Sequence, residues 1–162
     1  MPAQVLQTLQ NLGLKLAIAE SLTGGALASE LIAIPGASNT VLGSVVAYQT
    51  ELKQNILGVS KNLLEERGAV DADVAIEMAE GARALMAKSC GIPASSVVGI
   101  STTGVAGPDP QDGKPVGEVH IAITADDRSA TYTFHFAGGR NEIRAQAVMA
   151  AINALREHFT GS

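Results

Sequence analysis

The sequence predicts an α/β fold, a three-layer α/β/α sandwich in which helices cover both faces of a mixed β-sheet. Short apolar runs alternate with helical patterns along most of the chain, which is typical of helices layered on a sheet. Two alternating segments near the C-terminus flank a short polar turn, so part of the sheet is expected to be antiparallel. Aromatic residues are only 3% of the 162 residues, so aliphatic side chains must fill the core of one domain spanning residues 1–162.

The first part of the chain alternates helix and strand, with a helix over 2–12, a strand over 14–20, a helix over 26–34 and a strand over 41–48. The first helix has apolar residues at helical spacing, namely Val5, Leu6, Leu9 and Leu12, and Gly13 follows as a stop signal. The second strand is rich in β-branched residues, and Pro35-Gly36 ends the helix before it.

Three helices follow, over 51–57, 61–67 and 72–89. Ser60 is expected to cap the second of them. The third is the longest and carries one apolar face, made of Val74, Met78, Ala82, Leu85 and Met86. Cys90 ends this helix before Gly91 and is expected to pack against the fold.

Strands are expected over 96–102, 118–125 and 130–136, the last two as an antiparallel hairpin, and a helix over 140–159 ends the chain. The Pro/Gly/Asp-rich stretch 107–117 is interpreted as a loop inside the domain. The predicted order is therefore α-β-α-β-α-α-α-β-β-β-α.

The net charge is −5, which argues against a general nucleic-acid binder, because such proteins need a basic face. The single cysteine allows no internal disulfide, which favours a reducing compartment. The N-terminus lacks the pattern of a signal peptide, and no apolar stretch reaches the ~20 residues of a membrane span. We therefore expect a cytoplasmic protein that binds neither nucleic acid nor a membrane.

The first segment that suggests chemistry is 19–25, where a strand runs into hydroxyls and glycines. Gly24 and Gly25 let the backbone approach a ligand, and the next helix N-terminus would offer free N–H groups to an anion. The alternative is that Ser21 or Thr23 only caps that helix.

Two further segments carry a serine and a lysine. Ser38 lies in a turn before a strand, where most serines only make turn hydrogen bonds. Tyr48 ends that strand, and Lys53 lies five residues on, in the next helix. A partly desolvated lysine amine can act as the base for a serine hydroxyl, with the tyrosine relaying the proton or steadying the amine. The alternative is a solvated lysine and a half-buried tyrosine.

The remaining candidates follow the third strand and precede the last helix. Thr103 and Gly104 end a strand in a way that can present donors to a carbonyl or phosphate, unless the segment is only a flexible connection. Arg140 follows two glycines and could hold a phosphate at a helix start. Ordinary surface charge is the alternative, and more so for Arg144, one helical turn later.

No pattern points to a metal or cofactor, and none is expected. None of the histidines, His120, His135 and His158, has ligand spacing with another histidine or with Cys90. Walker, G-x-G-x-x-G and G-x-S-x-G motifs are absent from the sequence.

Together these segments resemble one family over nearly the whole chain. AESLTGG, PGAS, VVAYQTELKQNILGV, RGAV, GISTTGVAGP, GKPVGEVHIA and the GGR before the last helix resemble, in order and spacing, the C-terminal domain of the competence/damage-inducible protein CinA. The nucleotide-pyrophosphatase domain of full-length CinA has no counterpart in this sequence. The resemblance is to the stand-alone form, a nicotinamide mononucleotide deamidase.

The resemblance implies a site as well as an activity. It makes Ser38 the nucleophile, Lys53 its general base and Tyr48 their partner. It assigns substrate binding to hydroxyl, glycine and arginine positions, with backbone donors from the glycine loop: Ser21, Thr23, Gly24, Gly25, Thr103, Gly104 and Arg140.

The implied function is metal-free hydrolysis of the carboxamide of nicotinamide mononucleotide to nicotinic acid mononucleotide and ammonia, in pyridine nucleotide recycling. The partner is a small-molecule nucleotide substrate, and a homo-oligomer is expected. A rival interpretation is a non-catalytic nucleotide-binding or regulatory module linked to competence or DNA damage. That module would keep the glycine loops and Arg140 but would not need a serine–lysine pair.

Overall fold

The computed structural model describes residues 1–161. Its elements are, in chain order, α1 (Pro2–Asn11), β1 (Lys15–Glu20), α2 (Ala26–Ile32), η1 (Ala37–Asn39), β2 (Val41–Val46), α3 (Thr50–Asn55), α4 (Lys61–Arg67), α5 (Ala72–Cys90), η2 (Ala94–Ser96), β3 (Val97–Gly104), β4 (Glu118–Thr124), β5 (Ser129–His135) and α6 (Arg140–Thr160). Each predicted helix and strand is present with its ends within two residues of the prediction. Only the two short 3₁₀ turns η1 and η2 were not anticipated.

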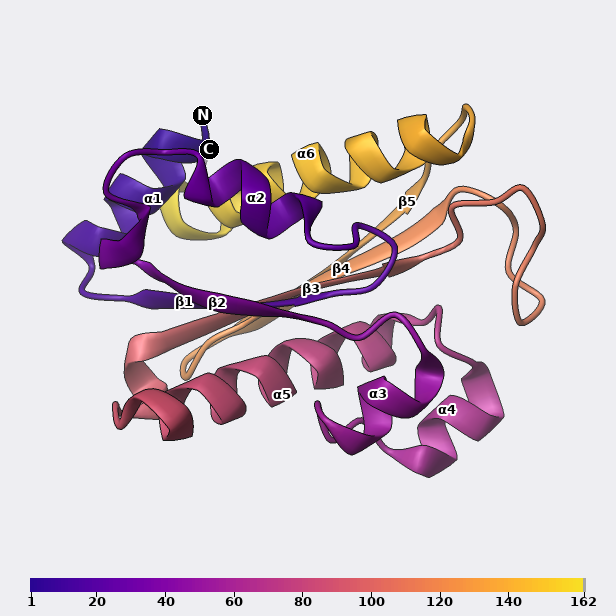
Figure 1. The fold of residues 1–162 in the computed structure, drawn as a ribbon, viewed down its shortest axis with the longest axis horizontal. Coiled ribbons are helices and arrows are strands. Elements are labelled where there is room, and N and C mark those ends of the chain that lie inside the picture. The colour runs from indigo at the N-terminus through magenta and orange to yellow at the C-terminus, as the bar shows by residue number, and fades with distance from the viewer. Residues whose placement is uncertain (162) are drawn as a thin grey trace.

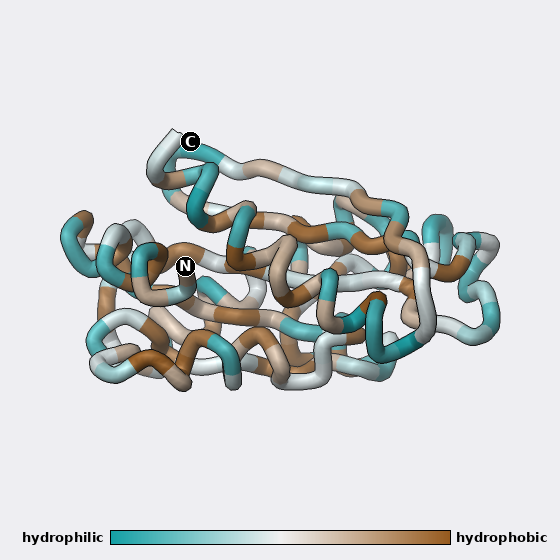
Figure 2. Tube along the Cα trace, turned by 90° about the horizontal axis from the view of Figure 1, so that it is seen from above, coloured by the Kyte–Doolittle hydropathy of each residue, from teal (hydrophilic) through white to brown (hydrophobic). Residues whose placement is uncertain are grey.

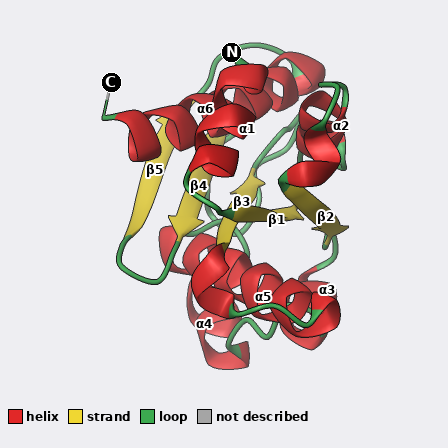
Figure 3. Ribbon diagram, turned by 90° about the vertical axis from the view of Figure 1, so that its left-hand side faces the viewer, coloured by secondary structure: helices red, strands yellow, loops and turns green. Residues whose placement is uncertain are grey.

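The strands form one five-stranded sheet in the order β2-β1-β3-β4-β5. Helices α1, α2 and α6 cover one face, and α3, α4 and α5 lie on the other (Figures 1 and 3). β1 is parallel to β2 and β3, whereas β4 is antiparallel to both of its neighbours, β3 and β5. The three-layer α/β/α sandwich with a mixed sheet is confirmed.

Apolar side chains fill both faces of the sheet. In β1, Leu16 and Ile18 belong to the cluster beneath α1, α2 and α6, whereas Ala17 and Ala19 face the cluster formed with α5. This alternation follows from the two-residue period of a strand, and burial of both faces is typical of parallel strands. Figure 2 shows the apolar residues running through the interior, with hydrophilic residues recurring on the outer loops.

Local signals in the sequence were accurate with a few exceptions. Ser60 caps α4 as predicted, accepting a hydrogen bond from the Leu63 N–H at 3.3 Å. The prediction that Cys90 packs is wrong, because the last turn of α5 extends past the core and leaves this cysteine exposed. Leu12 and Leu85, assigned to buried faces, are 56% and 37% exposed, and Leu12 lies just after the end of α1.

No helix within residues 1–161 combines the length and apolar character needed to cross a membrane.

Candidate active site

The carboxyl ends of the parallel strands β1, β2 and β3 meet at one edge of the sheet, toward the right of Figure 1. In open α/β sheets this edge is the usual place for a ligand. A mostly polar cavity of about 450 Å³ lies there, lined by residues 21–22, 48–50, 69–70 and 103–111 and by Arg140. A larger groove of about 560 Å³ between β5 and α6 has a mainly apolar lining without serine or lysine. The polar cavity is therefore the candidate site.

Lys53 lies behind this cavity and is almost fully enclosed, with 1% of its surface exposed. Its Nζ donates to the Ser21 hydroxyl oxygen at 2.9 Å, to the Ala47 carbonyl at 2.8 Å and to the Tyr48 carbonyl at 3.2 Å. None of the ion pairs found within residues 1–161 includes Lys53. The charge of this ammonium is thus not balanced by a carboxylate.

Burial lowers the pKa of Lys53 from 10.5 to about 8, because the charged form loses its hydration. The neutral amine keeps two N–H bonds and one lone pair. The two carbonyls can only accept hydrogen bonds, so they take the two N–H groups. The lone pair is then directed at Ser21, the one partner with a proton to give. This arrangement suits a general base acting on the Ser21 hydroxyl.

The same pKa predicts how stability depends on pH. Because the folded-state pKa lies below the unfolded value, between pH 8 and 10.5 the unfolded chain binds more protons, and the free energy of unfolding rises with pH. At about 1.36 kcal/mol per pKa unit, Lys53 contributes a rise of about 3 kcal/mol over that range. Urea denaturation of the wild type and of Lys53→Met at pH 7, 9 and 10.5 measures it. The free energy of unfolding of the wild type should increase relative to that of the variant as pH rises. A difference between the two free energies that does not change with pH would contradict the prediction.

The loop that carries Ser21 is shaped by Glu20, which the sequence analysis did not single out. The buried Glu20 carboxylate accepts hydrogen bonds from the N–H groups of Gly25, Leu27 and Ala28 and from the Ser44 hydroxyl. It therefore occupies the N-terminus of α2 as an internal anion. The expectation that this helix end is free for a substrate anion is wrong.

Only part of the predicted backbone donor set is available. The Gly24 N–H donates to the Ser21 carbonyl, closing a tight turn, and the Gly25 N–H is held by Glu20. Leu22 and Thr23 lie between Ser21 and Gly24, and their N–H groups have no acceptor within the described part of the chain. These two amides immediately follow Ser21, as the oxyanion donor follows the nucleophile in α/β-hydrolase turns.

Ser38 does not meet Lys53, so the expected Ser38–Lys53 pair is wrong. Ser38 is exposed on η1, at the amino end of β2, whereas Lys53 follows the carboxyl end. The six residues of β2 separate them by roughly 20 Å at about 3.3 Å per residue. The hydroxyl beside the lysine belongs to Ser21, which the sequence analysis placed among the substrate-binding residues.

Tyr48 contacts Lys53 through its backbone, not through its ring. Its carbonyl accepts from the lysine, while its phenol oxygen accepts from Arg140 Nη2 at 3.1 Å. Arg140 also donates to the Gly107 carbonyl and lines the cavity. The Tyr48 ring lines the cavity and is half exposed. The expected contact between the phenol and the lysine amine is therefore not formed.

The two predicted threonines hold the loops rather than point a free hydroxyl at the cavity. The Thr23 hydroxyl is within 2.8 Å of the Thr102 hydroxyl, and the Thr103 hydroxyl donates to the Ala69 carbonyl at 2.7 Å. Thr103 and Gly104 line the cavity, whereas Thr23, Gly24 and Gly25 do not.

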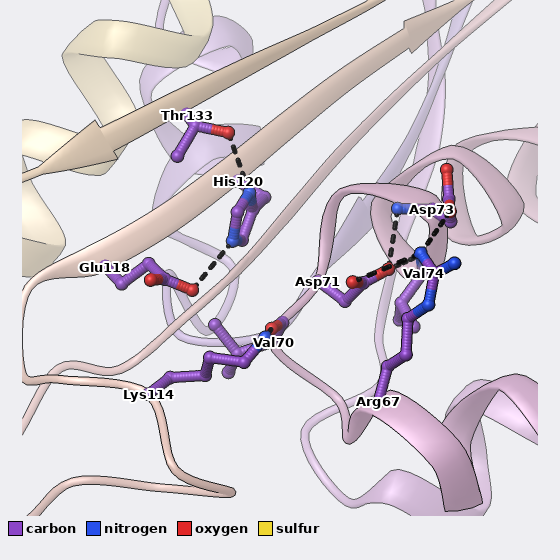
Figure 4. Close-up of polar contacts among 9 residues, drawn as sticks. All are labelled: Arg67, Val70, Asp71, Asp73, Val74, Lys114, Glu118, His120 and Thr133. Carbon is purple, nitrogen blue, oxygen red and sulfur yellow. Dashed lines mark hydrogen bonds and ion pairs between the residues drawn. The ribbon is translucent and has the colours of Figure 1, made fainter.

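The long loop after β3 is fixed over the cavity by its tip. The Asp112 carboxylate accepts from the Ala69 N–H at 3.2 Å. The Lys114 ammonium donates to the Val70 carbonyl at 2.9 Å, and Figure 4 shows these two residues. Both contacts connect the loop to the segment between α4 and α5. Ala69 and Val70 line the cavity, and Asp112 and Lys114 hold the loop against them.

His120 lies next to this wall but belongs to a structural network. Its ring bridges Thr133 and Glu118 at 3.0 and 2.9 Å (Figure 4). Among residues 1–161 no group of three or more histidine, cysteine or acidic side chains is arranged to hold a metal ion.

Comparison with known proteins matches the chain to one family. Residues 1–159 match the family described as the CinA C-terminal domain. A CinA-like protein of Frankia casuarinae is 42% identical over 146 residues, which are 90% of this chain and 32% of that protein. The chain thus spans about a third of the length of the curated relatives it matches.

Solved structures extend the match to the whole fold. A competence-damaged protein (CinA) superfamily protein from Escherichia coli is 35% identical with a TM-score of 0.85, covering 95% of this chain and 86% of that one. Its counterpart from Klebsiella pneumoniae is 31% identical with a TM-score of 0.87, covering 99% and 96%.

Proposed function

The chain belongs to the CinA C-terminal domain family, and on this basis we propose that it is an amidohydrolase that deamidates nicotinamide mononucleotide. The contact that carries the proposal is the 2.9 Å hydrogen bond between Lys53 Nζ and Ser21 Oγ. A serine activated by a desolvated lysine is a nucleophile–base pair suited to acyl transfer.

In the proposed reaction the neutral Lys53 amine takes the Ser21 proton as Oγ bonds to the carboxamide carbon. The N–H group of Leu22, which lines the cavity, would stabilise the oxyanion, which is usually the largest single electrostatic effect in such reactions. The Lys53 ammonium then protonates the leaving nitrogen, the C–N bond breaks, and ammonia departs. Water attacks the acyl-enzyme and gives one proton to Lys53, which returns it to Ser21 Oγ as nicotinic acid mononucleotide leaves.

The cavity is compatible with a charged aromatic mononucleotide. Its volume of about 450 Å³ falls in the range of small-molecule sites, roughly 300–1,000 Å³. The Tyr48 ring offers a face to a planar cationic ring. The guanidinium of Arg140 offers donors to a phosphate, and Asp109 is the one carboxylate in the lining.

The direct test is ammonia release from nicotinamide mononucleotide, nicotinamide riboside and nicotinamide, each with and without a chelator. We expect turnover of the mononucleotide above all, unchanged by the chelator, because the proposed steps use no metal. Binding of the mononucleotide without ammonia release would instead favour the rival regulatory module. Loss of activity in chelator, restored by a divalent ion, would overturn the metal-free steps.

Replacing Arg140 tests the proposal that its guanidinium binds the substrate phosphate. Arg140→Gln is expected to raise KM for the mononucleotide by about 10- to 100-fold, since a hydrogen bond to a charged group contributes about 1.5–3 kcal/mol. KM for the riboside, which lacks the phosphate, should change little. An equal loss for both substrates would mean that Arg140 acts only by holding Tyr48 and Gly107.

Cytoplasmic location and homo-oligomeric assembly stay predictions.

A further inference from the structure

Arg144, one turn into α6, makes its shortest hydrogen bond with the backbone of the loop that carries Ser21. Its Nε donates to the Leu22 carbonyl at 2.8 Å, and its Nη2 lies 3.4 Å from the Thr23 carbonyl. Nη1 donates to Asn141 on the same helix. The ion pairs present in residues 1–161 do not include Arg144. The Arg144 guanidinium therefore donates to backbone carbonyls and not to a carboxylate.

These contacts fix the direction of an amide. The Leu22 carbonyl and the Thr23 N–H belong to one peptide unit, and in a trans peptide the two groups point in opposite directions. Because Arg144 holds the carbonyl toward α6, the Thr23 N–H must point away from that helix. This N–H has no acceptor within the described residues.

The rest of the turn leaves that peptide without another brace. The Gly24 N–H closes the turn on the Ser21 carbonyl, and the Thr23 hydroxyl reaches Thr102. Neither contact involves the Leu22 carbonyl. Gly24 has a φ of +58°, and a Cβ there would lie 3.4 Å from Arg144 Nη2, so the guanidinium and the turn fit closely together.

We infer that Arg144 is a positioning residue for the loop that follows the nucleophile and carries the oxyanion donor. This inference rests on the proposed acyl transfer at Ser21. Arg144 touches neither Ser21 nor Lys53 through any contact found. It acts by fixing the Leu22–Thr23 peptide, and with it the Leu22 N–H beside the cavity. A preorganised donor needs no reorganisation when charge develops in the transition state.

The test compares Arg144→Met and Arg144→Lys with Arg156→Met, the same change further along α6 and away from the cavity. We expect Arg144→Met to lower kcat by about 10- to 100-fold, less than the 10²–10³-fold typical when a donor is deleted outright. KM should stay within about threefold. Arg144→Lys, which keeps one donor for the Leu22 carbonyl, should lose less, and Arg156→Met should match the wild type.

Two readouts separate positioning from a structural or binding role. The acid limb of the pH–rate profile should keep its midpoint, because the pKa of Lys53 is lowered by burial, which Arg144 does not provide. Thermal unfolding gives the folded fraction for each variant. Loss of stability with unchanged kcat per folded enzyme, or a raised KM with unchanged kcat, would overturn the inference.

Acylation of Ser21 by 4-nitrophenyl acetate makes the test independent of the natural substrate. The burst of 4-nitrophenol is expected to slow in Arg144→Met by about the same factor as kcat falls. Ser21→Ala is the negative control and should show no burst. A wild-type burst without ammonia release would sink the proposed substrate while still testing Arg144. Equal burst rates in Arg144→Met and the wild type would overturn the role of Arg144 alone.

Discussion

Replacing Ser21 by alanine is expected to lower ammonia release from nicotinamide mononucleotide by roughly three orders of magnitude or more, as when the nucleophile of a serine hydrolase is deleted. Ser21 Oγ is the hydroxyl within hydrogen-bond distance of Lys53 Nζ, at 2.9 Å. Without it the reaction loses its covalent intermediate and keeps only binding and the oxyanion donors. Steady-state assays, with thermal unfolding to confirm the fold, measure the effect.

Ser38→Ala is the matched control. It removes the same atom from the serine of the PGAS turn, which is exposed on η1 beyond the far end of β2. We expect its turnover to stay within about twofold of the wild type, in line with the small effects of most surface substitutions. An inactive Ser38→Ala beside an active Ser21→Ala would reverse the assignment and restore the nucleophile that the family resemblance alone implied.

Lys53 is expected to give the second large effect. Lys53→Arg keeps a positive charge but cannot act as a base, because guanidinium does not deprotonate in proteins. Lys53→Met removes the charge and roughly keeps the shape of the buried chain. Both variants should lose turnover by roughly 10²-fold or more, since general-base catalysis contributes about 10²–10⁴-fold. Substantial activity in Lys53→Arg would mean that the lysine supplies only charge.

The pH profile of the wild type tests the same residue without mutation. The base must be neutral, and its pKa is lowered to about 8. Activity as kcat/KM should therefore rise with pH through a midpoint near that value and level off above it. A profile already flat at pH 6 would exclude Lys53 as the titrating base. The Arg144 variants should share the wild-type midpoint, which separates the two residues.

The sequence by itself determined the elements and their layering. Helical spacing, β-branched runs and Gly or Pro stop signals are local features of the sequence. Strands β1 to β5 and the Ser60 cap could therefore be recognised without knowledge of any long-range contact. The same local patterns identified the loops that surround the cavity, since small residues after a parallel strand gather at one sheet edge.

Only the tertiary structure decided which hydroxyl meets the lysine. Ser21 and Lys53 are 32 residues apart in sequence and meet because β1 and β2 are parallel neighbours whose carboxyl ends share an edge. Ser38 is nearer to Lys53 in sequence, but one whole strand lies between them. Proximity along the chain is not proximity in space when an extended segment of about 3.3 Å per residue intervenes.

The same limit applies to the charged residues. The sequence places Glu20 at the end of a strand, and only the folded structure brings its carboxylate to the N–H groups at the start of α2. Arg144 reads as helix-surface charge, and only the packing of α6 beside the loop after β1 brings it to the Leu22 carbonyl. The sequence pattern records which face of an element is apolar, whereas the partner of a polar side chain depends on which elements become neighbours.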